Sequence, residues 1–214
     1  PKEEEECSIC LDDLRKYGDS KFSIAACCGK GMHNKCREGV KASSMSFEQK
    51  THCVMCRTEY PASQKGVVDQ LRPWVEKGKA WAQFLLGCRY RDGEGVDQSY
   101  QQARELFELS ASQGDISAQY NLGIMCERGQ GVDQSNERAA EYWEAAARQG
   151  IASAQYNLGN LYVDRLVGVE QSYEIAREWL MKSAEQGNAY AIKQLQKLDK
   201  HEGRTTPSFI PKPF

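Results

Sequence analysis

The sequence predicts a mostly α-helical protein, in which a small cysteine-rich domain precedes a solenoid of helix pairs. Two observations carry this prediction. Seven of the nine cysteines in the 214-residue chain lie before residue 57. After about residue 66, similar segments return every 36 residues, and a fixed period of this length is typical of stacked supersecondary units.

The overall composition excludes several classes of protein. The net charge is -2 and 40% of the residues are apolar. A protein that binds nucleic acid through its phosphates shows a basic surplus, and a membrane span needs roughly 18 apolar residues in a row. The sequence has neither, and no signal peptide is visible in its opening PKEEEE. We therefore expect no nucleic-acid partner, no membrane association and an intracellular, reducing compartment, in which unpaired thiols persist.

The N-terminal segment contains eight candidate metal ligands in four groups of two. They are Cys7 and Cys10, Cys27 and Cys28, His33 and Cys36, and Cys53 and Cys56. Eight such ligands suffice for two closed tetrahedral zinc sites, and a spacing of two intervening residues lets both side chains of a pair turn toward one ion. The pattern therefore predicts two structural Zn²⁺ ions.

The adjacent pair Cys27 and Cys28 is unusual, because most zinc modules separate these two ligands. If Cys27 were only a buried residue, one site would keep three ligands, and a closed structural site needs four. Lys30 is no substitute at neutral pH. We therefore assign both cysteines as ligands and interpret His52 as an exposed neighbour of Cys53 that could replace one of them.

Residues 7–60 resemble a RING-type zinc finger, notably in the segments CSICL and CVMCR. The resemblance implies cross-braced sites, with one ion on Cys7, Cys10, His33 and Cys36 and the other on Cys27, Cys28, Cys53 and Cys56. It also implies an apolar contact with a ubiquitin-conjugating enzyme through Ile9, Val54 and Met55, and contact of Arg57 with both that enzyme and ubiquitin. Such a ubiquitin ligase contributes no catalytic residue, because it acts by positioning the reactive thioester.

Two alternatives to the ligase stay open. A non-catalytic adaptor is favoured by Val54, which stands where proline is common, and by the lack of a tryptophan between Cys36 and Cys53. A PHD finger, which reads histone tails, has the same ligand order. It carries a tryptophan where this chain has Thr51, and no aromatic cage is evident here.

Three segments in the rest of the chain repeat one pattern. They read AQFLLGCRYRDGEGVDQS, AQYNLGIMCERGQGVDQS and AQYNLGNLYVDRLVGVEQS. The third contains one extra residue near 165–168. Each unit is expected to hold two helices, the second of which begins after an N-cap serine and ends at a Gln-Gly pair whose glycine adopts a left-handed conformation. The three serines are Ser99, Ser135 and Ser172.

These segments resemble Sel-one-like repeats, relatives of the tetratricopeptide repeat, over residues 66–199. The resemblance implies a right-handed superhelix that binds proteins and has no activity of its own. The expected organisation is repeats at about 80–115, 116–151 and 152–188, capping helices at 66–78 and 189–199, and a flexible tail at 200–214.

Recurring aromatic residues of the repeats are expected to fill the space between helices, and the two remaining thiols to serve packing. These residues are Tyr120, Tyr156, Trp143, Trp179, Cys88 and Cys126. Asn121 and Asn157 also recur, but Leu85 replaces them in the first unit, so the sequence assigns no groove residue.

The leading hypothesis is a RING-type ubiquitin ligase that recruits a protein substrate through its repeats. Residues 61–65 are expected to link the two halves. Whether the protein is an enzyme stays open at this point, as do its substrate, its cognate conjugating enzyme and the choice between cytoplasm and nucleus.

Overall fold

The computed structural model describes residues 22–24, 31–33, 62–164 and 171–204. The described residues form two short strands and eight helices, which confirms the mostly helical architecture. The chain divides into two compact units, residues 1–99 and 100–214. None of the described helices is both long and apolar enough to cross a membrane.

The described residues of the first unit form a two-stranded sheet and two helices. Strands β1 (Phe22–Ile24) and β2 (Gly31–His33) pair antiparallel, with Phe22 opposite His33 and Ile24 opposite Gly31. Helices α3 (Gln64–Glu76) and α4 (Ala80–Asp92) follow. These two helices pack together, and the rings of Trp74 and Trp81 lie 5.8 Å apart between them.

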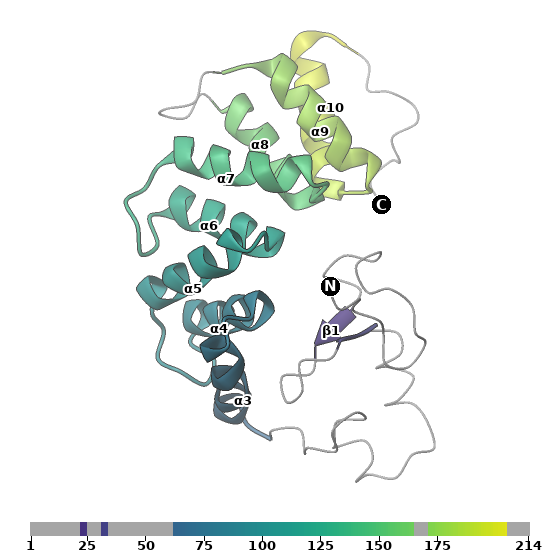
Figure 1. Cartoon of the computed structure of the whole chain (residues 1–214). Helices are drawn as coiled ribbons and strands as arrows, with labels where there is room; N and C mark the ends of the chain where they lie inside the picture. The colour runs from purple at the N-terminus through teal and green to yellow at the C-terminus, as the bar shows by residue number, and fades with distance from the viewer. Residues whose placement is uncertain (1–21, 25–30, 34–61, 165–170, 205–214) are drawn as a thin grey trace. The chain divides into compact units, whose positions relative to one another are not determined.

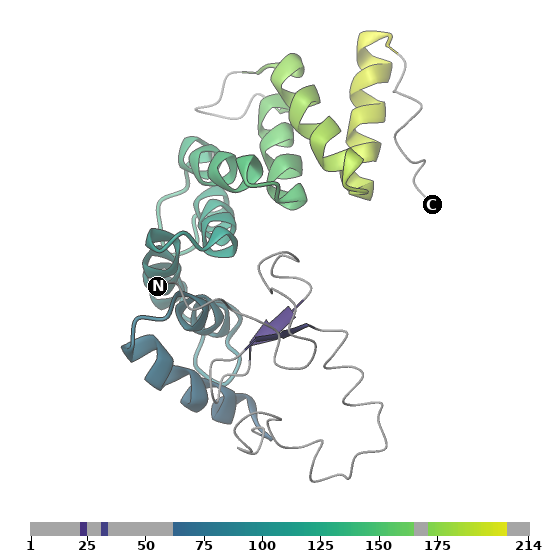
Figure 2. The same cartoon turned by 45° about the vertical axis from the view of Figure 1, so that its right-hand side comes forward.

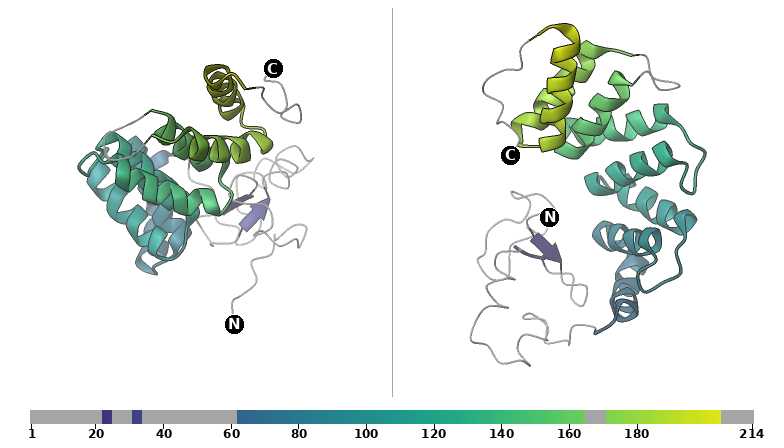
Figure 3. Two further views of the ribbon diagram at one scale, coloured as in Figure 1. Left: turned by 90° about the horizontal axis from the view of Figure 1, so that it is seen from above. Right: turned by 180° about the vertical axis from the view of Figure 1, so that it is seen from behind.

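The described residues of the second unit form six helices that pack in chain order. They are α5 (Tyr100–Ser112), α6 (Ile116–Arg128), α7 (Asn136–Arg148), α8 (Ala152–Val163), α9 (Tyr173–Glu185) and α10 (Ala189–Glu202). Each helix lies beside the next one along the chain (Figures 1 and 2). The views from above and from behind show the same order (Figure 3). This is the arrangement expected of a helical solenoid.

A shared turn ends the first helix of each repeat. A glutamine near the end of this turn donates a side-chain hydrogen bond back to a backbone carbonyl in the last turn of the helix. Carbonyls at this position have no acceptor role within the helix itself. The three bonds join Gln98 to Arg91 O (2.8 Å), Gln134 to Glu127 O (2.8 Å) and Gln171 to Val163 O (2.9 Å). The glutamine of the repeated turn is thus a helix cap.

The second glycine of two of these turns lies directly against another helix start. A Cβ atom on Gly95 would come within 2.4 Å of the backbone of Gln64, where α3 begins. A Cβ on Gly131 would come within 2.8 Å of the backbone of Tyr100, where α5 begins. Real Cβ atoms do not approach backbone so closely, so these turns require glycine.

Two of the three predicted serine caps of the second helices are seen as side-chain hydrogen bonds. Ser135 and Ser172 accept hydrogen bonds through their side chains from the amides of Arg138 (3.1 Å) and Ile175 (3.3 Å), and α5 begins directly after Ser99. The glycines of the three Gln-Gly pairs have φ of 89°, 91° and 83°. The left-handed ends predicted from the sequence are therefore confirmed.

The core of the second unit combines small residues with one large side chain per repeat. Ala139 and Ala176 are fully buried, as are Trp143 on α7 and Leu180 on α9. Trp179 is only half-buried and packs at the edge of the cluster that contains Trp143. The extra residue of the third repeat shifts its second helix by one position, so Leu180 and not Trp179 occupies the place of Trp143.

The leading capping helix starts and ends two residues earlier than the sequence predicts, and the trailing one is longer. Helix α3 begins at Gln64, because the side chain of Ser63 caps the amide of Gly66 at 3.1 Å, and so part of the predicted linker is helical. Helix α10 continues to Glu202, where the predicted tail has already begun. Its last turn is held to α9, because Arg177 forms ion pairs with Asp199 and Glu202.

Candidate functional site

Nearly all of the predicted zinc and partner-binding residues lie outside the described residues. This applies to the seven N-terminal cysteines, to the conjugating-enzyme contacts Ile9, Val54, Met55 and Arg57, and to His52 and Thr51. His33 is described only as the last residue of β2. The zinc ligands and the RING-type surface therefore remain predictions.

The described part of the chain offers no cluster of metal-ligating side chains. In these residues no three His, Cys, Asp or Glu side chains gather where they could hold a metal ion. The thiol of Cys126 is buried in α6, and burial raises its pKa, so it stays protonated at neutral pH and is a poor nucleophile. This agrees with the packing role expected for Cys126.

A row of aromatic and amide side chains instead runs along the first helices of the second unit. Helix α6 supplies Tyr120 and Asn121, and α8 supplies Tyr156 and Asn157 at the equivalent positions. Tyr190 of α10 extends the row. We refer to these five residues as the first-helix row. The two tyrosines of α6 and α8 and Asn157 are half-buried, whereas Asn121 is nearly covered.

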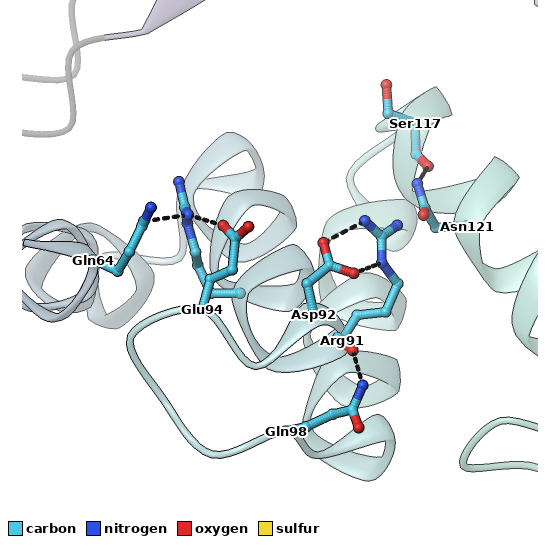
Figure 4. Close-up of polar contacts among 8 residues, drawn as sticks. Gln64, Arg91, Asp92, Glu94, Gln98, Ser117 and Asn121 are labelled. Carbon is cyan, nitrogen blue, oxygen red and sulfur yellow. Dashed lines mark hydrogen bonds and ion pairs between the residues drawn. The ribbon is translucent and has the colours of Figure 1, made fainter.

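Hydrogen bonds hold the α6 part of the row in place. The amide of Asn121 donates to the carbonyl of Ser117 at 2.7 Å (Figure 4). The backbone carbonyl of Tyr120 accepts from the indole of Trp143 at 3.1 Å. The side-chain amide of Asn157 donates to the phenol oxygen of Tyr120 at 3.4 Å, which joins α8 to α6. Core and surface thus share one network here.

An aromatic contact holds the other end of the row. The rings of Tyr156 and Tyr190 lie 6.1 Å apart and are tilted by 42°. Tyr190 is nevertheless 70% exposed, more than Leu109 at 52% or Ile175 at 39%, the other exposed large apolar side chains among the described residues. An exposed tyrosine beside half-buried partners is a common feature of protein interaction surfaces.

The charged groups at the end of α4 have structural roles. The guanidinium of Arg91 makes two bonds of 2.8 and 2.7 Å with the carboxylate of Asp92, and its backbone carbonyl accepts from Gln98 (Figure 4). The hydrogen bond from Arg91 lowers the pKa of Asp92 below its ordinary value. Arg89 likewise contacts Gln64 and Glu94. These groups stabilise a turn and leave the first-helix row as the better candidate.

The recurrence of Asn121 and Asn157 is visible in the sequence, whereas Tyr190 and the lysines that follow it on α10 were not predicted as site residues. The only available signal was the spacing of Lys193, Lys197 and Lys200, which repeats at three and four residues and therefore marks one helix face. The contact of Tyr190 with Tyr156 had no signal, because it depends on how α10 packs.

The chain was compared with protein families and known structures. The model of the Sel1 repeat matches residues 82–115, 116–151 and 152–188, which together make up half of the chain. This confirms the predicted repeats over residues 82–188. The comparison with curated proteins found no match.

Two solved structures are similar to the chain. One is a protective antigen present in uropathogenic Escherichia coli strains, which displays an SLR fold; it is 36% identical with a TM-score of 0.64. The other is a Sel1 repeat protein from Oxalobacter formigenes, 28% identical with a TM-score of 0.61. The matches cover 68% and 66% of this chain. They span 31% of the antigen and 57% of the Oxalobacter protein.

Proposed function

The chain belongs to the Sel1 repeat family, whose fold serves protein interactions, and on that premise we propose that it binds a protein partner on the first-helix row. One observation carries the proposal. The pair Tyr120 and Asn121 recurs one repeat later as Tyr156 and Asn157. Asn157 contacts Tyr120 across the two repeats, so their polar groups form one continuous surface.

The chemistry of the row suits a peptide segment. Amide side chains both donate and accept hydrogen bonds, as a peptide backbone requires, and phenol rings provide apolar area together with a polar tip. The side chains already contact one another, so binding a peptide would immobilise few additional rotamers.

Peptide-display selection against the full-length protein tests this proposal. Peptides selected by the wild type should bind at least about tenfold more weakly to the variant Tyr156→Ala with Asn157→Ala, because hot-spot residues of an interface carry most of its binding energy. The control variant is Leu109→Ala with Ile175→Ala, which removes exposed side chains from the second helices. Equal binding to all three proteins would overturn the proposal, provided that their melting temperatures agree.

For the N-terminal segment, we propose a RING-type zinc finger over residues 7–60 that holds two Zn²⁺ ions. Its donor set of seven thiols and one imidazole is typical of closed zinc sites. Bound zinc would supply folding free energy to this small domain.

Metal analysis of single variants tests the ligand set. The wild type should contain two zinc ions per chain, and Cys27→Ser and Cys28→Ser should each lose one. His52→Ala should keep both, because His52 is interpreted as a neighbour of the site. A Cys27→Ser protein that retains both ions while His52→Ala loses one would exchange the roles of these residues.

The resemblance to RING domains favours a ubiquitin ligase as a second candidate function, in which the repeats recruit the substrate. A ubiquitin-discharge assay with a panel of charged conjugating enzymes separates it from the adaptor. Ile9→Ala and Arg57→Ala should abolish discharge, and Arg57→Lys should restore little of it, because lysine lacks the planar fork of arginine. Discharge that is unaffected by Arg57→Ala would contradict the ligase function. If zinc-loaded wild-type protein discharges ubiquitin from none of the enzymes, the adaptor is the favoured function.

A further inference from the structure

The exposed face of α10 carries a stripe of basic side chains. Lys193, Lys197 and Lys200 follow one another at spacings of four and three residues, which places them on one side of the helix. Arg204 follows directly after the left-handed C-cap Gly203. All four are exposed, whereas Ala191, Ile192, Leu195 and Leu198 of the same helix are buried. We call these four residues the α10 stripe.

The acidic residues of α10 are turned away from the stripe. Asp199 is 1% exposed and Glu202 is half-buried, and both are bound to Arg177 of α9. The only ion pair of the stripe within the described ranges is a 4.0 Å contact of Arg204 with Glu202, a carboxylate that Arg177 already engages. Lys193, Lys197 and Lys200 make no ion pair with any described residue. The charges of α10 are therefore separated: Asp199 and Glu202 are bound to Arg177, whereas the three lysines form no ion pair with described residues.

Charge complementarity favours an acidic occupant and disfavours two others. The C-terminal residues 205–214 contain a lysine but no aspartate or glutamate, so they do not complement the stripe. A second copy of α10 would present like charges. A nucleic acid would bring a long polyanion close to α9, which packs on α10 and exposes Glu174, Glu178 and Glu185. A short acidic peptide avoids that repulsion.

We propose that the α10 stripe, together with Tyr190 at its N-terminal end, docks an acidic segment of the protein partner. The helical part of the stripe, from Lys193 to Lys200, spans about 10 Å along the helix axis. A short run of carboxylates can lie over this length. Tyr190 lies one turn before Lys193 and contacts Tyr156, so it connects the stripe with the first-helix row and offers its exposed ring to an apolar residue of the same segment. The inference rests on the proposed function and names the chemistry of the partner.

Fluorescence anisotropy with defined peptides tests the docking of an acidic segment. The probe is a labelled peptide with six glutamates and one tryptophan, and its counterpart carries glutamines in place of the glutamates. The full-length protein should bind the glutamate peptide at least about tenfold more tightly at low salt, and the difference should shrink as salt screens the charges. The variant Lys193→Glu with Lys197→Glu should lose this preference.

A matched control separates the stripe from net charge. Lys65→Glu with Lys79→Glu makes the same change of charge on exposed residues of the first unit and should bind like the wild type. The variant Lys193→Gln with Lys197→Gln should show an intermediate preference for the glutamate peptide. It replaces the charge-reversed variant in the test if that variant does not fold. Tyr190→Ala should weaken binding of the glutamate peptide more than it weakens binding of the same peptide without its tryptophan.

Several results would overturn the inference. These are equal binding of the two peptides, equal loss in the stripe and control variants, or tighter binding of a labelled single-stranded RNA of the same length. The failure is distinct from that of the proposed function. Displayed peptides that depend on Tyr156 and Asn157 but are not acidic would keep the row as the site and reject the stripe.

Discussion

The second and third repeats share one backbone pattern but stabilise it in different ways. In the second repeat the fully buried Trp143 packs against Gly123 of the facing helix; in the third, Leu180 packs against Gly159. The indole of Trp143 also donates a hydrogen bond to the backbone of Tyr120. Leu180 has no donor, and Tyr156 contacts Tyr190 on the neighbouring helix instead.

This difference concerns the proposed binding surface as well as the core. In the second repeat, a core side chain fixes the backbone that carries Tyr120. In the third, the equivalent Tyr156 is held by another exposed side chain. We infer that the first-helix row has a rigid end at α6 and a more adaptable end toward α8 and α10.

The largest expected effect is that of truncating the two core side chains. Trp143→Ala should lower the free energy of unfolding by about 3–5 kcal/mol, since it leaves a large cavity and removes a partly buried hydrogen bond. Leu180→Ala should fall at the lower end of its range of about 2–5 kcal/mol. Urea unfolding monitored by circular dichroism measures both. A larger loss for Leu180→Ala would break the comparison.

Substitution of the facing glycines should have the next largest effect. A Cβ on Gly123 would lie 2.4 Å from the indole nitrogen of Trp143, whereas a Cβ on Gly159 would lie 2.8 Å from Leu180 Cγ. Overpacking of this kind costs about 1–3 kcal/mol. Gly123→Ala should lower the free energy of unfolding more than Gly159→Ala does, because the indole ring of Trp143 is rigid. Adding Trp143→Leu should recover part of the loss, and a double variant less stable than both single variants would refute the steric explanation.

The serine caps provide a test in which the two repeats should agree. Ser135→Ala and Ser172→Ala each remove one side-chain bond to a helix amide, of 3.1 and 3.3 Å. Each should lower stability by about 1 kcal/mol. Threonine at either position should retain most of the stability. If the losses of stability for the two variants differ by more than about 1 kcal/mol, the repeats are coupled through more than their cores.

The smallest effect concerns Glu127 of the second repeat, whose counterpart in the third is the uncharged Val163. Burial raises the pKa of Glu127 above its ordinary value, although Arg128 opposes the shift. The folded state therefore favours the protonated carboxyl, and lowering the pH through the raised pKa removes a destabilising contribution. Glu127→Gln should exceed the wild type in stability at neutral pH by an amount that disappears in acid. A gap that is constant with pH would contradict this assignment.

The local features of the repeats could be predicted from the sequence. The helix starts at Ser135 and Ser172 and the left-handed Gly150 depend on hydrogen bonds within a few residues, so the repeated pattern determines them. The 36-residue period likewise placed the three repeats that the family model matches.

The contacts between helices could not be predicted in the same way. The pair of Arg177 with Asp199 and the ring contact of Tyr156 with Tyr190 join residues on different helices, and both depend on packing angles. The displacement of Trp179 by Leu180 follows from one extra residue, whose effect on the core is visible only in three dimensions. The zinc ligands remain a prediction, because Cys7 and the other N-terminal cysteines lie outside the described residues.

The close approach of each turn glycine to a helix start has a consequence for how such a chain can lengthen. Gly95 meets Gln64 and Gly131 meets Tyr100, and both members of the first contact lie 36 residues before those of the second. A duplication of 36 residues copies a turn glycine and a helix start together. The array can therefore gain a repeat by duplication of a stretch of its own gene, because the added repeat would use the same contact.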